Sequence, residues 1–195
     1  MTARRRQQQA RSRRIPRFRH DGRGRRDCQW GESLLQPAFT AAVLRRCKEC
    51  GLHTALDTSG FLGARADDAL IGDTDLVLLD VKSFDADVYH ALTGGDLAPT
   101  PEFARRLDRL GARMWIRYVL VPGWTDDLKA VDDLARFVAG LHSVERADVL
   151  PFHKLGAPKY RQLGIPFPLR DTPVPDPALT SREREVFRQR GGSAY

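Results

Sequence analysis

Long hydrophobic runs are missing from this sequence of 195 residues. A helix that spans a bilayer needs about 20 consecutive apolar residues, and no stretch approaches that length. No apolar core typical of a signal peptide occurs near the start. The sequence therefore predicts a soluble, cytoplasmic protein with no membrane association.

Cysteine is also scarce, with three in the whole sequence. An odd count without a secretory signal argues against a framework of disulfides. Cys47 and Cys50 have the spacing of metal ligands, but zinc would need further ligands, for which Cys28 and His53 are the candidates. The simpler interpretation is two small residues one turn apart on a helix, with the zinc site as an alternative.

Acidic residues are nearly absent from the first 26 positions, which hold eleven Arg and one Asp. The formal net charge of this segment is +10, whereas that of the whole chain is +7, so residues 27–195 carry a net charge of −3. With few apolar residues it cannot offset the entropy cost of ordering, which predicts a disordered basic leader over 1–30 and a folded domain over 31–195. Because the folded part is mildly acidic, nucleic acid is not its expected partner.

Short apolar runs alternate along the rest of the chain with stretches of helical periodicity. The runs lie within 53–58, 75–82, 114–121 and 147–152. Near-continuous runs of this length, joined by helices, are typical of buried parallel strands. A proline-rich segment over 156–177 and a last helix over 177–189 follow. The sequence predicts an α/β fold with too few units to close a barrel of six or eight strands.

Polar residues stand where these runs end. Ligands of parallel sheets and barrels bind at the carboxyl ends of the strands, so Asp57, Thr58, Asp80, Lys82 and His153 are predicted to meet there. Asp80 and Lys82 are two apart on a strand and point the same way, which suits a zwitterionic ligand or a cation bridged to a carboxylate. The oxygen atoms of Asp57, Thr58 and Asp80 suit a bound cation.

Arg117 lies inside the third run and alternates with Ile116 and Tyr118. It therefore faces either the barrel interior or the helix layer. A buried arginine needs an acidic partner, which the interior carboxylates or an incoming peptide could supply.

Six motifs in order carry a family resemblance, at 31–36, 52–61, 75–82, 92–95, 115–126 and 149–156. As a set, over about 31–189, they resemble the pyruvate formate-lyase activating enzymes, which are radical S-adenosylmethionine proteins. The resemblance implies a partial (β/α)₆ barrel of the TIM type, truncated at its N-terminus. It also implies reductive cleavage of S-adenosylmethionine at a [4Fe–4S] cluster, with the resulting radical removing hydrogen from a glycine of the lyase.

The resemblance also implies roles for individual residues. Gly31 and Glu32 match a motif that holds the amino group of S-adenosylmethionine, whereas Asp80, Val81, Lys82 and His153 match further contacts to it. Asp57, Thr58 and Asp80 match a monovalent-cation site, and Arg117 resembles an arginine that seats the glycyl loop of the lyase. The implied partners are pyruvate formate-lyase or a related glycyl-radical enzyme and a small electron-transfer protein.

One family motif is missing. The cluster is held by Cys-x₃-Cys-x₂-Cys, and none of the three cysteines here has that spacing. Without three thiolates no such cluster forms and no electron reaches the sulfonium. We therefore expect no bound cluster and no activity from the chain as written.

The resemblance stops abruptly before Gly31, which predicts that 1–30 is not family sequence and that strand 53–58 is an exposed edge. The alternative function is a non-catalytic binding protein that uses the Arg-rich arm for nucleic acid or the barrel fragment for the lyase.

Overall fold

The structure is a computed structural model that describes residues 25–28, 32–191 and 194–195. For 25–28 it describes the backbone alone. Most of the predicted leader, and Gly31, lie outside these ranges.

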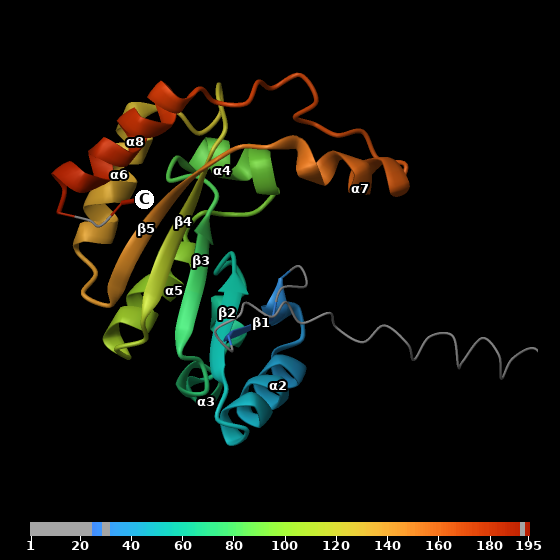
Figure 1. Ribbon diagram of the computed structural model, residues 1–195, viewed down its shortest axis with the longest axis vertical. Helices are drawn as coiled ribbons and strands as arrows, with labels where there is room; N and C mark the ends of the chain where they lie inside the picture. The colour runs from blue at the N-terminus through green and yellow to red at the C-terminus, as the bar shows by residue number, and fades with distance from the viewer. Residues whose placement is uncertain (1–24, 29–31, 192–193) are drawn as a thin grey trace, which may run out of the picture.

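A five-stranded parallel sheet forms the centre of the molecule (Figure 1). Its strands are β1 (Arg25–Cys28), β2 (His53–Thr58), β3 (Leu76–Val81), β4 (Met114–Leu120) and β5 (Val144–Pro151). Their order in the sheet is their order in the sequence, with β2 to β5 joined by helical segments. The predicted α/β fold with part of a TIM-like barrel is confirmed.

Strand β1 corrects one prediction. It pairs in parallel with β2, with Arg25 opposite His53 and Cys28 opposite Leu56. The expectation that β2 is an exposed edge is therefore wrong. A ladder is made by backbone N–H and C=O groups, so a short strand can form from Arg25, Arg26, Asp27 and Cys28 without any apolar periodicity that a sequence pattern would show.

Seven α-helices and three 3₁₀ turns complete the described part of the chain. The helices are α2 (Pro37–Glu49), α3 (Asp68–Gly72), α4 (Ala86–Thr93), α5 (Pro99–Arg109), α6 (Leu128–Ala139), α7 (Ala157–Gln162) and α8 (Pro177–Gln189). The 3₁₀ turns are η1 (Ser33–Leu35), η2 (Gly63–Arg65) and η3 (Lys154–Gly156). Aspartate side chains accept backbone N–H bonds at the N-termini of α3, α4, α6 and α8, which explains why these helices begin where they do.

The two faces of the sheet differ. On β4, Met114, Ile116, Tyr118 and Leu120 are buried in the core formed with the helices, and the residues between them are half-buried. The second face lines the inside of a barrel that the described strands do not close, so its side chains stay partly exposed. This alternation places Arg117 on the inner face.

The C-terminal segment differs in part from its prediction. Helix α8 has the predicted bounds, whereas α7 was not foreseen inside the proline-rich segment. The last two residues run beside β5, where Tyr195 donates its N–H to the carbonyl of Ala147 at 3.1 Å and accepts from Val149 at 3.1 Å. Across the described ranges, every helix is too short or too polar to cross a bilayer.

Candidate functional site

Four charged side chains form a row across the inner face, near the carboxyl ends of β2 and β3 and the middle of β4. Arg117 Nε donates to Asp80 Oδ1 at 2.6 Å, and Arg117 Nη2 donates to Asp57 Oδ1. Lys82 Nζ lies 3.0 Å from Asp80 Oδ2. The register explains the contact, because Asp80 lies directly opposite Arg117. We call Lys82, Asp80, Arg117 and Asp57, in that order, the charged row.

The charged row is shielded unevenly from solvent. The side chains of Asp57 and Arg117 are 13% and 17% exposed, whereas that of Lys82 is 37% exposed. Burial opposes the charge on Arg117, but the carboxylates of Asp80 and Asp57 outweigh it and raise the pKa of the guanidinium. Arg117 is therefore a fixed charge, and Lys82 is the cation of the row that a ligand can reach.

Glu32 fastens the N-terminus of η1 to the end of β2. Its Oε1 accepts from the Thr58 hydroxyl at 2.7 Å and the Leu34 N–H at 3.1 Å. Its Oε2 accepts from the N–H and the hydroxyl of Ser59 at 3.0 and 2.6 Å. A carboxylate offers about four lone-pair sites, and four donors of the protein occupy this one.

Two of the predicted site residues turn their side chains to the helix-covered face. Thr58 is 2% exposed and its hydroxyl bonds Glu32, while Val81 is 3% exposed in the core. The reason is the alternation of side chains along a strand, which sends each to the face opposite its neighbour. The structure therefore unites Asp57, Asp80, Lys82 and Arg117, and it leaves the side chains of Thr58 and Val81 outside the row.

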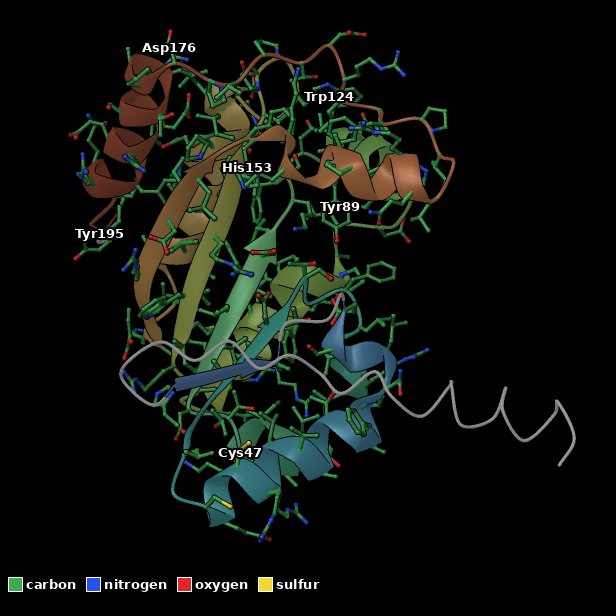
Figure 2. The ribbon with its side chains drawn as sticks, turned by 45° about the vertical axis from the view of Figure 1, so that its right-hand side comes forward. Cys47, Tyr89, Trp124, His153, Asp176 and Tyr195 are labelled. Atoms are coloured by element: carbon green, nitrogen blue, oxygen red, sulfur yellow. The ribbon has the colours of Figure 1, made fainter. Side chains whose placement is uncertain are left out.

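His153 follows β5 and precedes η3, with an exposed side chain. The carboxyl ends of parallel strands meet at one edge of the sheet, so His153 and the charged row share that edge. Figure 2 shows His153 at this end of the sheet.

A pocket of about 360 Å³ adjoins the row. Its walls come from η1, the turn after β2 and the end of α4, and its lining is Glu32, Leu35, Ser59, Phe61, Leu62, Lys82, Tyr89, Thr93 and Gly95. Lys82 belongs to both the pocket and the charged row. The apolar walls were not foreseen, because they come from loops that only the fold brings together.

Sequence reasoning also missed two contributions to this region. Ser59, which binds Glu32 through two groups, carries no signal beyond its place after β2. Arg146 and Asp148 form a further ion pair on the inner face, with Arg146 Nε 2.7 Å from Asp148 Oδ1. Their spacing of two residues on a strand is the same signal that singled out Asp80 and Lys82, and it could have found them.

The described thiols lie far from this site. Cys47 and Cys50 are free and lie where α2 ends, just before β2 begins. Figure 2 shows Cys47 at the end of the sheet opposite His153. Among the described side chains no three from His, Cys, Asp and Glu gather as a metal set. These cysteines therefore do not fit a cluster at the strand ends, and the zinc alternative has no third described ligand.

A parallel sheet with a charged, partly apolar site at its strand ends is shared by many classes of protein, and comparison with known families identifies this one. The Radical SAM superfamily matches residues 13–137 of this chain. The chain belongs to the Radical SAM superfamily.

Within that superfamily the chain is similar to activating enzymes. It is 40% identical over 146 residues to the pyruvate formate-lyase-activating enzyme of Clostridium pasteurianum, covering 75% of this chain and 61% of the relative. It is 37% identical over 164 residues to the pyruvate formate-lyase 1-activating enzyme of Escherichia coli, covering 83% and 66%. The chain thus spans about two thirds or less of these relatives.

A solved structure supports the fold. The crystal structure of a domain of pyruvate-formate lyase-activating enzyme from Bacteroides vulgatus superposes with a TM-score of 0.73. The superposition covers 87% of this chain and 96% of that domain at 24% identity. At that identity the likeness concerns the fold alone.

Proposed function

We propose that this chain is the S-adenosylmethionine-binding portion of an activase of a glycyl-radical enzyme. The observation that carries the proposal is the reachable Lys82, which joins the charged row to a pocket of about 360 Å³ at the strand ends. Relatives that are 37% and 40% identical and are named pyruvate formate-lyase activating enzymes support the choice of partner.

The residues divide the work of binding in this proposal. S-adenosylmethionine would bring a carboxylate, an amino group, a sulfonium and an adenosyl group. Lys82 is the accessible cation for the carboxylate, and Asp80 holds its ammonium in place at 3.0 Å. His153 at the end of β5 is proposed to contact the adenosyl group. Gly31 and the backbone of Val81 complete the proposed contacts.

In this proposal Glu32 does not contact the ligand directly. Because its four hydrogen bonds come from the protein, we assign it to positioning η1 and Ser59 beside the pocket. The amino group of S-adenosylmethionine would then lie against η1 and Ser59, which Glu32 holds in place.

The proposal stops at binding. The described cysteines do not fit the cluster that the family uses, so we propose that this chain holds S-adenosylmethionine without cleaving it. A glycyl-radical enzyme such as pyruvate formate-lyase remains the proposed protein partner. A small electron-transfer protein would serve only a chain that carries a cluster.

Binding of S-adenosylmethionine, measured by isothermal titration calorimetry, tests the proposal. We expect saturable binding at one site, weakened about 10-fold or more in Lys82→Met, because a charged hydrogen bond contributes about 1.5–3 kcal/mol. The matched control is Lys129→Met, since Lys129 is an exposed lysine on α6 that pairs with Asp133. Its affinity should equal that of the unmodified chain.

A folded chain that binds no S-adenosylmethionine, or equal weakening in both variants, would contradict the binding proposal. Anaerobic reconstitution with iron and sulfide tests the second part. We expect neither a stoichiometric [4Fe–4S] absorbance nor 5′-deoxyadenosine on addition of a reductant. A stoichiometric cluster would show that the assignment of the cysteines is wrong.

A further inference from the structure

The charged row occupies the place where the sequence pattern predicts a bound cation, which the family resemblance implies to be monovalent. Both carboxylates of that prediction, Asp57 and Asp80, accept hydrogen bonds from one guanidinium. We propose that Arg117 is the built-in counter-cation of Asp57 and Asp80, and that this site consequently takes up no monovalent metal ion.

The charge count supports this assignment. Asp57 and Asp80 carry two negative charges at 13% and 22% exposure, and Arg117 and Lys82 supply two positive charges within 3.0 Å of them. Removing one partner of such a shielded group leaves a costly uncompensated charge. A potassium or sodium ion added to the complete row would instead bring an excess positive charge, and it would compete with hydrogen bonds already formed.

The oxygen ligands for a metal ion are also incompletely assembled. The Thr58 hydroxyl, which the prediction included, bonds Glu32 at 2.7 Å on the other face of β2. Asp80 Oδ1 and Oδ2 are both engaged, by Arg117 at 2.6 Å and by Lys82 at 3.0 Å. Metal ions that bind oxygen are held by several oxygen atoms together. The hydrogen bonds of Thr58 and Asp80 keep the predicted ligand oxygens apart or occupied.

Arginine suits this task better than lysine. Its side chain is long enough to reach from β4 across β3 to Asp57, and its planar group donates through separate nitrogens to two acceptors. The guanidinium is charged at every physiological pH. The counter-charge is therefore permanent, whereas a dissolved cation would come and go with its concentration.

This inference does not depend on S-adenosylmethionine binding, because the test measures the ligand-free protein. The melting temperature is recorded in KCl, NaCl and choline chloride at equal ionic strength. Choline is too large to enter a cation site, so it controls for screening. The variants are Arg117→Gln, which removes the charge, and Arg45→Gln, which removes an exposed arginine paired with Asp73 at 3.1 Å.

We expect the unmodified chain to melt at the same temperature in the three salts. Arg117→Gln should melt about 5 °C lower or more in choline chloride and recover part of the loss, saturably, in KCl or NaCl. Arg45→Gln should shift by about 2 °C or less without any metal-specific recovery. Asp57→Asn added to Arg117→Gln should abolish the recovery.

Saturable stabilisation of the unmodified chain by potassium or sodium, absent in choline, would overturn the proposal. So would a folded Arg117→Gln variant that responds to no metal ion. If that variant does not fold, sodium NMR of the unmodified chain decides the question. An unbroadened sodium line supports the proposal, and broadening that excess potassium reverses contradicts it.

Discussion

At the scale of single residues, Glu183 is the most unusual group outside the site. Its side chain is fully buried on α8, and its Oε2 has no hydrogen-bond partner among the described residues. The contact from Arg182 to Oε1 is long, at 3.4 Å. Burial raises the pKa of this carboxyl, and the nearby charges of Asp126 and Asp127 add to the rise. The charged form of Glu183 therefore opposes folding.

This raised pKa predicts a direction for the pH dependence of stability. A group whose pKa is higher in the folded state gives its full stabilisation below its unfolded value, about 4.5, and loses it as the pH rises through the folded value. The loss is about 1.4 kcal/mol for each pH unit between the two values. Glu183→Gln should flatten this decline, measured by urea unfolding at several pH values from 4 to 8.

The control for Glu183 is Glu185→Gln, since Glu185 is an exposed glutamate on the same helix that pairs with Arg188. It should leave the pH profile of the free energy of unfolding unchanged. Parallel profiles for Glu183→Gln and the unmodified chain would show that the buried carboxyl does not titrate in this range.

At the scale of elements, the docking of α5 on η2 shows how tightly the loops beside the site are packed. A Cβ added to Gly63 would lie 2.2 Å from Cγ of Phe103 and 2.5 Å from its Cβ. Arg106 of the same helix donates to the carbonyl of Ala66 at 2.7 Å. Only glycine at position 63 allows Phe103 to come this close. The contact fixes η2, which directly follows the pocket residues Phe61 and Leu62.

Gly63→Ala should therefore destabilise the fold by about 1–3 kcal/mol or more through overpacking, because Phe103 is 3% exposed and has no room to move. Urea unfolding measures the change. Gly72→Ala is the matched control, because a Cβ there meets nothing within 4 Å and Gly72 ends a helix. That variant should be unchanged or slightly more stable. Equal effects of the two substitutions would contradict the steric explanation.

At the scale of the whole molecule, the described sheet is open, and its two outer strands are β1 and β5. An uncovered edge offers free N–H and C=O groups to other chains. Ala194 and Tyr195 cover the middle of the β5 edge through backbone hydrogen bonds. The Tyr195 ring also lies 4.4 Å from the guanidinium of Arg146, which holds the segment in place.

Removal of Ala194 and Tyr195 should consequently increase self-association, because it exposes the backbone of Ala147 and Val149. Light scattering during a concentration series measures this effect. Tyr195→Ala keeps the backbone pairing and removes the ring, so it should associate less than the deletion. If the deletion variant stays as monodisperse as the full chain, the prediction that Ala194 and Tyr195 protect the β5 edge from self-association is wrong.

The sequence determined the strand runs from β2 to β5 and the polar residues at their ends. Apolar runs and side-chain alternation are local properties, so Asp57, Asp80, Lys82 and His153 could be assigned to one edge in advance. The same local reasoning found α8 with its bounds. It missed β1, because backbone pairing leaves no mark on an Arg-rich segment.

Only the tertiary structure decided how those residues meet. The register between strands places Arg117 within hydrogen-bond distance of Asp57 and Asp80. The alternation of side chains along β2 places Thr58 on the other face, where it bonds Glu32. Such contacts join residues far apart in sequence, and they depend on distances that no spacing along the chain encodes. The residue types at the site thus follow from the sequence, whereas the counter-charge for its carboxylates follows from the fold.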